Sequence, residues 1–214
     1  FFQTFILFLP IFYTDVFGLP AAAMGTMFLL TRIFDAVNDP IMGTIADRTN
    51  TRWGKFRPYI IVFALPFAIV GVLTFTTPDL DASGKLIYAY ITYTLLMVLY
   101  TAVNVPYSAL MAVITPNSLE RTEISSFRFV AAFAGGFIVQ AATISLVEYF
   151  GKGDDAVGWQ WAMACLAGLA FILLLITFIT TKERVHPPKD QKSNFKQDLK
   201  DLFTNKPWLL IAGA

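Results

Sequence analysis

A group of charged residues between positions 31 and 40 lies inside an apolar segment that runs from residue 21 to residue 46. This segment is long enough to cross a bilayer as a helix, which takes about 20 residues. In a helix, Arg32, Asp35 and Asp39 follow an i, i+3, i+7 spacing and share one face. Each charge near the membrane centre costs roughly 2.5–3.5 kcal/mol, so the two carboxylates cost on the order of 5–7 kcal/mol. They therefore need partners, and a cation is one such partner.

The composition is that of an integral membrane protein. Of the 214 residues, 56% are hydrophobic and 14% are charged, whereas soluble domains carry about a quarter charged residues. The single cysteine, Cys165, excludes a disulfide framework within the chain. The chain starts directly in apolar sequence, without the basic region of a secretory signal peptide. Both ends resemble interrupted helices, so we expect the sequence to be a fragment.

Hydropathy predicts six transmembrane segments, the first truncated at its start, and the beginning of a seventh; each full segment is near or above the length that a bilayer requires. The six segments are residues 1–17, 21–46, 59–76, 86–114, 125–149 and 159–180, and the seventh begins at residue 207. The fourth and fifth are separated by a polar loop at residues 115–123. The expected organisation is an N-terminal six-helix bundle over residues 1–181 with a truncated first helix, a connector over 182–206, and the start of helix VII over 207–214.

The loops alternate in charge along the chain. Loop 47–58 has four basic residues and one acidic residue, and segment 182–206 has seven basic and four acidic residues. Loops 77–85 and 150–158 each contain two aspartates and one lysine. By the positive-inside rule the basic loops are cytoplasmic. We therefore expect a multi-pass protein of the cell (inner) membrane with its N-terminus and its connector in the cytoplasm.

Six helices, a long connector and a new helix form the layout of one half of a twelve-helix transporter built from two repeats. Residues 43–48, Gly-Thr-Ile-Ala-Asp-Arg, with the basic residues after them, resemble the loop between helices II and III of the major facilitator superfamily. A structural or gating role is expected for the charged residues of this loop, Asp47, Arg48, Arg52, Lys55 and Arg57. The alternative is that they only set the orientation in the membrane.

Residues 35–43, Asp-Ala-Val-Asn-Asp-Pro-Ile-Met-Gly, and residues 52–58, Arg-Trp-Gly-Lys-Phe-Arg-Pro, resemble the glycoside–pentoside–hexuronide:cation symporters. The similarity covers the whole chain and includes Tyr13-Thr14-Asp15, Asn104-Val105-Pro106-Tyr107 and Arg128. It implies an all-α membrane protein, the N-terminal half of a twelve-helix major facilitator fold. It also implies sugar transport driven by sodium, lithium or protons, in which Asp35 and Asp39 serve the cation.

The residues around the two aspartates are suited to binding a hard cation, which prefers oxygen ligands. Asp35, Asn38 and Asp39 can bring carboxylate and amide oxygens together, and the resemblance adds the hydroxyl of Thr101. We expect a Na⁺ site formed by these four residues and no organic cofactor. The alternative is a structural ion pair between Asp35 and Arg32, and the two arrangements can coexist. Li⁺ and H⁺ stay open as coupling ions, since two close carboxylates can also share a proton.

The fourth segment carries a second candidate site. Tyr93, Tyr100, Asn104 and Tyr107 follow an i, i+7, i+11, i+14 spacing on one broad face. Aromatic rings can cover the C–H surface of a sugar, while amides and hydroxyls match its OH groups. We expect Tyr93 to pack in the bundle and Pro106 either to open the helix locally or merely to bend it. The expected substrate-binding residues are Tyr100, Asn104, Tyr107 and, by the resemblance, Arg128. The alternative for Arg128 is an arginine that reaches the membrane interface.

The function that these observations favour is symport of a glycoside, pentoside or hexuronide with a cation. Members of the family that transport melibiose have an aspartate where this chain has Asn104, so the sugar cannot be copied from them. The expected partners are the sugar, the cation, the bilayer and a C-terminal six-helix half, with no nucleic acid. A transporter of lysolipids on the same fold is the alternative. An enzyme is disfavoured because the chain offers no His or Cys pair for catalysis.

Overall fold

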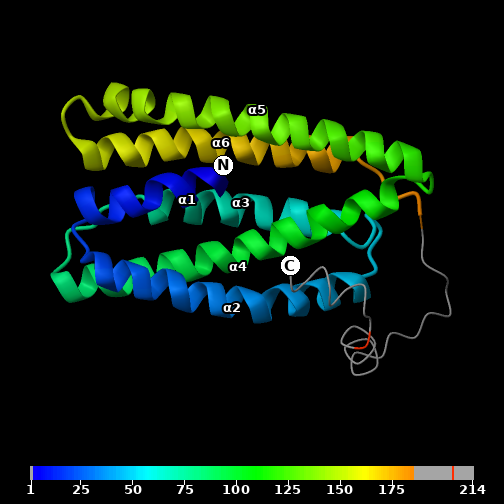
Figure 1. The fold of residues 1–214 in the computed structure, drawn as a ribbon, viewed down its shortest axis with the longest axis horizontal. Coiled ribbons are helices and arrows are strands. Elements are labelled where there is room, and N and C mark those ends of the chain that lie inside the picture. The colour runs from blue at the N-terminus through cyan, green and yellow to red at the C-terminus, as the bar shows by residue number, and fades with distance from the viewer. Residues whose placement is uncertain (1, 186–203, 205–214) are drawn as a thin grey trace. The chain divides into compact units, whose positions relative to one another are not determined.

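The structure, a computed structural model, describes residues 2–185 and residue 204. The chain divides into two compact units, residues 1–184 and 185–214, and the account below concerns the first. Its elements in chain order are α1 (Phe2–Ile11), the π-helix η1 (Phe12–Val16), α2 (Ala21–Arg48), α3 (Arg57–Thr74), α4 (Ala82–Ile114), α5 (Ser118–Gly151) and α6 (Asp155–Thr180) (Figure 1). Most of the expected connector and the start of helix VII lie outside the described residues.

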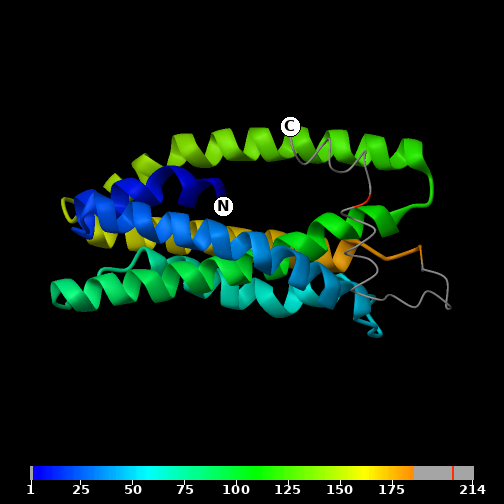
Figure 2. The same cartoon turned by 60° about the horizontal axis from the view of Figure 1, so that its bottom comes forward.

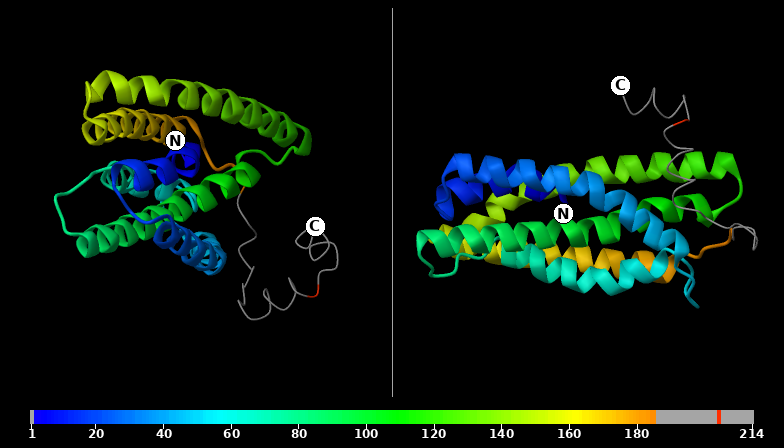
Figure 3. Two further views of the ribbon diagram at one scale, coloured as in Figure 1. Left: turned by 60° about the vertical axis from the view of Figure 1, so that its left-hand side comes forward. Right: turned by 90° about the horizontal axis from the view of Figure 1, so that it is seen from below.

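The helices of the first unit lie side by side and form one bundle (Figures 2 and 3). α3 packs against both α4 and α6, α5 packs against α6, and α2 packs against α4. α1 contacts α5, and η1 contacts α6. These contacts place α2 and α5 on different sides of the bundle, and both present many apolar side chains on the outside.

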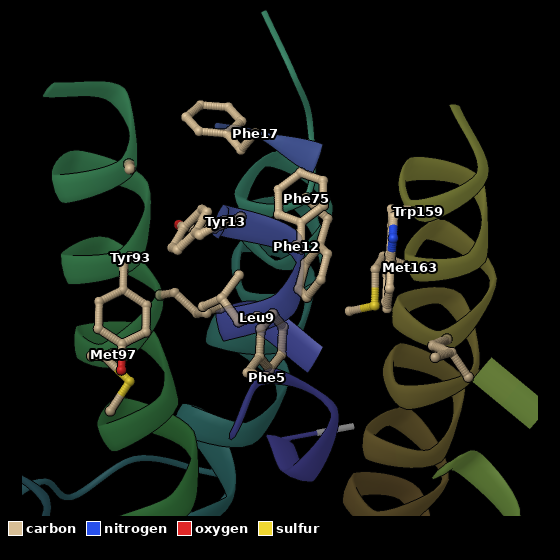
Figure 4. Packing of buried hydrophobic residues seen from close by; sticks show 14 of the residues in the cluster. Phe5, Leu9, Phe12, Tyr13, Phe17, Phe75, Tyr93, Met97, Trp159 and Met163 are labelled. Carbon is tan, nitrogen blue, oxygen red and sulfur yellow. The ribbon is translucent and has the colours of Figure 1, made fainter. Parts of the chain in front are cut away.

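An aromatic core holds the first helix in the bundle (Figure 4). The Phe12 ring is fully buried, and its centroid lies 4.9 Å from that of Phe75 at the end of α3. The Phe75 ring in turn stacks on Trp159 near the start of α6, at 5.5 Å. Tilted and edge-on ring pairs of this kind add about 0.5–1.5 kcal/mol each beyond the apolar area that they bury. The rings therefore join the first, third and sixth helices at one end of the bundle.

The structure corrects the start of the fifth segment. Residues 118–123, expected in a loop, form the first turns of α5. The Asn117 side chain caps this helix by accepting a hydrogen bond from the backbone nitrogen of Leu119, at 3.0 Å. The loop prediction was wrong because hydropathy detects burial in a membrane, whereas a capped helix continues into polar sequence. Arg128 consequently lies almost three turns inside α5, not at its start.

Side-chain caps also lengthen two other helices beyond their apolar segments. Asp81 accepts a hydrogen bond from the backbone of Gly84, at 3.1 Å, and α4 begins at Ala82. Asp154 accepts one from Val157, at 3.2 Å, and α6 begins at Asp155. α4 continues as a helix through Pro106 as far as Ile114, so the proline does not interrupt it.

Four helices are long and apolar enough to cross a membrane, namely α3, α4, α5 and α6. The residues from Phe2 to Val16 form a shorter apolar helix. α2 has 28 residues, ample length for a span. Its charged residues, Arg32, Asp35 and Asp39 among them, lower its mean hydropathy and set it apart from the four. The helix with the least apolar sequence is therefore the one that carries the candidate cation site.

Candidate cation and substrate site

The structure brings Asp39 and Thr101 together across the contact between α2 and α4. The hydroxyl of Thr101 donates a hydrogen bond to Oδ1 of Asp39, at 2.9 Å. Thr101 is buried, with 3% of its surface exposed, whereas Asp39 is exposed, so this contact lies between the helices at the border of the packed region. A hydrogen bond to a charged acceptor is among the stronger ones in proteins. Two of the four expected cation ligands are thus in direct contact.

Asp35 lies one turn before Asp39 on α2 and has a free acceptor. Its Oδ1 atom is buried and accepts no hydrogen bond in the part of the chain that the structure describes. Asp39 and Arg32 both act on this carboxylate through their charges. Arg32 donates no hydrogen bond to this oxygen in the described part of the chain, so the structure does not show the expected alternative, an ion pair through this atom. A buried carboxylate oxygen without a donor is expensive unless a cation or a proton neutralises it.

The four expected cation ligands, Asp35, Asn38, Asp39 and Thr101, all offer oxygen atoms. Asn38 is half-buried on the same helix, between the two aspartates in sequence. Among the described residues, no three His, Cys, Asp or Glu side chains gather in a way that could hold a metal ion. Two carboxylates with an amide and a hydroxyl oxygen are ligands that Na⁺ or Li⁺ accepts, and of the four expected ligands the structure joins Asp39 and Thr101.

Two of the expected substrate residues meet across α4 and α5. The guanidinium carbon of Arg128 lies 5.2 Å from the centroid of the Tyr107 ring, within the range of a cation–π interaction. Arg128, Tyr107 and Asn104 are all half-buried. The Arg128 side chain therefore reaches a neighbouring helix, and the membrane interface alone does not account for its position.

Tyr100 and Tyr93 have different surroundings on α4. The Tyr100 ring stacks on Phe2 of α1, with 3.6 Å between centroids and 7° between the planes. Tyr100 also lies within electrostatic range of Asp35, Asp39 and Arg32. Tyr93 is 7% exposed and packs on Phe28 within the core, which agrees with its expected packing role. Tyr93 and Tyr100 both lie within electrostatic range of Arg32 and Asp35, and Tyr100 lies within range of Asp39 as well.

Sequence reasoning missed Glu183, which holds the basic loop after α2. Its carboxylate accepts hydrogen bonds from the backbone nitrogens of Lys55 and Phe56, both at 2.8 Å, and of Arg57 at 3.1 Å. The only local signal was an acidic residue between Lys182 and Arg184 in a segment expected to be a solvated connector. Because the partners lie more than 120 residues away in sequence, no local pattern predicts them.

The charged side chains of this loop differ in their contacts. Arg57 donates a hydrogen bond to the carbonyl oxygen of Phe178 at 2.6 Å and covers the Phe178 ring at 4.7 Å. Arg52 covers the ring of Trp53 at 4.7 Å. Asp47 and Arg48 are exposed, and Lys55 is half-buried. Arg57 is thus the basic side chain that joins the loop to the end of α6.

A family model described as "MFS/sugar transport protein" matches residues 1–214, the whole chain. The chain is 48% identical over 210 residues to the inner membrane symporter YicJ of Escherichia coli. The chain belongs to the glycoside–pentoside–hexuronide:cation symporter family of the major facilitator superfamily. The family supplies the fold: a six-helix bundle that forms one half of a twelve-helix transporter.

Two other relatives have names that state a substrate. The isoprimeverose transporter of Lactiplantibacillus pentosus is 42% identical over 207 residues, and a glucuronide carrier protein homolog of Escherichia coli is 36% identical over 211 residues. The match to YicJ covers 98% of this chain and 45% of YicJ. The match to the isoprimeverose transporter covers 95% of this chain and 43% of that protein. The match to the glucuronide carrier homolog covers 97% of this chain and 46% of that protein. The chain thus spans less than half the length of the curated relatives that it matches.

Proposed function

We propose that this chain carries the cation site and half of the sugar path of a symporter that couples sugar movement to Na⁺. The observation that carries the proposal is the contact between Thr101 and Asp39, one turn from an Asp35 oxygen that finds no donor among the described residues. Intramembrane carboxylates are typical of ion pathways. The relatives named as a symporter and as carriers of sugars support the same conclusion.

The Thr101 hydroxyl gives the site two states. In one state, the hydroxyl donates a hydrogen bond to Asp39, at 2.9 Å. To coordinate a cation, the same oxygen turns a lone pair toward the ion, and its proton must point elsewhere. Cation binding therefore replaces the hydrogen bond between Thr101 of α4 and Asp39 of α2 by an ion that both side chains coordinate.

Coupling to the sugar follows from the position of Thr101 on α4. Tyr100 precedes it directly, and Asn104 and Tyr107 follow within two turns. An ion that alters the contact between α2 and α4 thereby acts on the residues proposed for the sugar. By reciprocity, the sugar must increase the affinity for the cation by the same factor. Movement across the membrane then requires this bundle to rock against a second one.

The proposed substrate is a neutral or acidic sugar with hydroxyls in reach of Asn104 and Arg128. Asn104 can donate and accept hydrogen bonds without repelling a carboxylate, and Arg128 has five N–H donors for hydroxyls or a uronate. Arg128 keeps its guanidinium over Tyr107, so the donors are held in place between α4 and α5. This pair supports recognition of a pentoside, a glycoside or a hexuronide.

We also propose the orientation in the membrane. The backbone nitrogen of Arg184 donates to the carbonyl of Val113, at 2.8 Å, so the ends of α4 and α6 meet at the side of the basic loop. At the opposite end, Lys85 donates to the carbonyl of Phe17, at 3.3 Å, close to the acidic loop that follows α3. The segregation of basic loops to one end supports a cytoplasmic position for that end.

The test is uptake of labelled sugars by the full-length protein in membrane vesicles, with gradients of Na⁺, Li⁺ and H⁺ imposed in turn. We expect Asp39→Asn to abolish uptake driven by the cation gradient, and Asp79→Asn, an exposed aspartate in the loop after α3, to retain it. Full cation-coupled uptake by Asp39→Asn would sink the assignment of the site. If the protein takes up lysolipids and none of the sugars, the proposed substrate is wrong and the alternative substrate class, lysolipids, is correct.

A further inference from the structure

Two glutamines in apolar helices meet between α1 and α5. The side-chain nitrogen of Gln140 lies 3.5 Å from the side-chain oxygen of Gln3. Each amide offers two donors and one acceptor with two lone pairs, so this one long contact leaves most of their capacity unused. Gln3 is exposed and Gln140 is half-buried, so both can reach another molecule. Polar groups inside membrane segments are expensive when unsatisfied and tend to mark substrate pathways.

The α5 backbone leaves space for the Gln3 side chain at one position. A Cβ atom at Gly136 would collide with the Gln3 amide, whereas a Cβ atom at Gly135 would meet nothing within 4 Å. Gly136 therefore lets the Gln3 amide lie close against α5. An alanine at Gly136 would therefore displace the Gln3 amide, whereas an alanine at the neighbouring Gly135 would not.

The glutamine pair continues the proposed sugar path along the bundle. Phe2, next to Gln3, stacks on Tyr100 at 3.6 Å. Gly136 lies eight residues beyond Arg128 on α5, a rise of about 12 Å. Tyr100 lies seven residues before Tyr107 on α4, a rise of about 10 Å in the same direction because the two helices are antiparallel. Along the helix axes, the contact of Gln3 with α5 thus lies about 12 Å from Arg128, farther than one sugar ring extends.

We infer that Gln3 and Gln140 bind the second unit of a disaccharide or other glycoside, while Arg128 and Asn104 bind the first. This inference rests on the proposed function and adds to it a preference for substrates longer than one sugar. The amides supply neutral donors and acceptors for hydroxyls, and Phe2, next to Gln3, stacks on Tyr100, one turn before Asn104. A monosaccharide can contact the glutamines or the Arg128–Asn104 group, but not both.

The experiment compares substrates of one and two units in the full-length protein. Radiolabelled xylose, glucose and glucuronate are offered as monosaccharides, and a disaccharide that contains each of them is offered in parallel. Initial uptake rates are measured in vesicles. The variants are Gln3→Leu, Gln140→Leu and Gly136→Ala, with Gly135→Ala as the matched control. The thermal unfolding of each purified variant is measured as well, so that a folding defect is recognised.

We expect Gln3→Leu and Gly136→Ala to raise the KM for the disaccharide by about tenfold, the loss of one to two hydrogen bonds. The KM for the monosaccharide should stay within about twofold, and Gly135→Ala should behave as the unmodified protein. Equal losses for both lengths would overturn the inference and assign the glutamines to helix packing. Uptake of monosaccharides alone by the unmodified protein would also overturn it, whereas no uptake of any sugar would overturn the proposed function itself.

Discussion

The carboxylate of Glu183 accepts a hydrogen bond from the backbone nitrogen of Phe56, 2.8 Å away and 127 residues earlier in the chain. Phe56 is the N-cap residue of α3, and no side chain of its own segment caps the helix. Glu183 satisfies the free N–H groups from outside, and its charge is favourable at a helix N-terminus. The start of α3 and the segment after α6 therefore stabilise each other.

Replacement of Glu183 should destabilise the bundle. Glu183→Ala leaves three backbone N–H groups without their acceptor, and we expect a loss of about 1–3 kcal/mol in the free energy of unfolding. Glu183→Gln keeps one acceptor oxygen and should lose less. Thermal unfolding of the purified full-length protein measures both, with exposed Lys182→Ala as the control. If Glu183→Ala and Lys182→Ala unfold alike, the capping role is wrong.

Gly54 should tolerate no side chain. Its φ is +109°, and a Cβ atom there would collide with the Glu183 carboxylate. Gly18 has a φ of +81° with nothing within 4 Å, so Gly18→Ala reports the backbone strain alone, about 1–2 kcal/mol. We expect Gly54→Ala to be the more destabilising variant in thermal unfolding. In the double variant with Glu183→Ala the two losses should not add, because both disrupt one contact; strict additivity would contradict the proposed collision.

The Thr101 hydroxyl should set the affinity for the cation. Thr101→Val keeps the shape and removes the oxygen, and we expect the Na⁺ concentration for half-maximal sugar uptake to rise by about tenfold. Thr101→Ser keeps the oxygen and should stay close to the unmodified protein. The measurement is uptake at fixed sugar and varied Na⁺. An unchanged Na⁺ dependence in Thr101→Val would exclude Thr101 from the cation site.

The Tyr107 ring should hold Arg128 in place for the sugar. Tyr107→Phe keeps the aromatic face under the guanidinium, whereas Tyr107→Leu removes it. A cation–π contact contributes about 0.5–2 kcal/mol, so we expect the KM for sugar to rise several-fold in Tyr107→Leu and less in Tyr107→Phe. The Na⁺ dependence should change only through its coupling to the sugar. Equal effects of both variants would instead assign the role to the tyrosine hydroxyl.

The orientation can be tested with single cysteines. Asn50 in the basic loop and Asp79 in the acidic loop are both exposed. In a Cys165→Ala background, a membrane-impermeant maleimide added outside intact cells should label Asp79→Cys and spare Asn50→Cys. Permeabilised cells should allow labelling of both. The reverse pattern in intact cells would invert the proposed topology.

The fifth helix shows how far the sequence predicts the fold. Its apolar part, from residue 125 onward, was found by hydropathy because a bilayer requires a long apolar segment. Its first turns were missed because the polar residues after the N-cap Asn117 form a helix outside the apolar part. Hydropathy thus predicted that this helix exists. The residue at which the helix begins depends on its cap, which hydropathy does not detect.

The sequence by itself determined the membrane class, the family and the helix that carries the charges, because hydropathy, spacing and motif all lie within short segments. It also indicated Asp35, Asp39 and Thr101 as candidates. Only the tertiary structure decided which of them touch: Thr101 contacts Asp39, while an oxygen of Asp35 has no donor within residues 2–185. The Glu183 cap and the Gln3–Gln140 pair likewise join residues more than 100 positions apart. Such contacts depend on how helices pack, and no local sequence pattern encodes the packing partner.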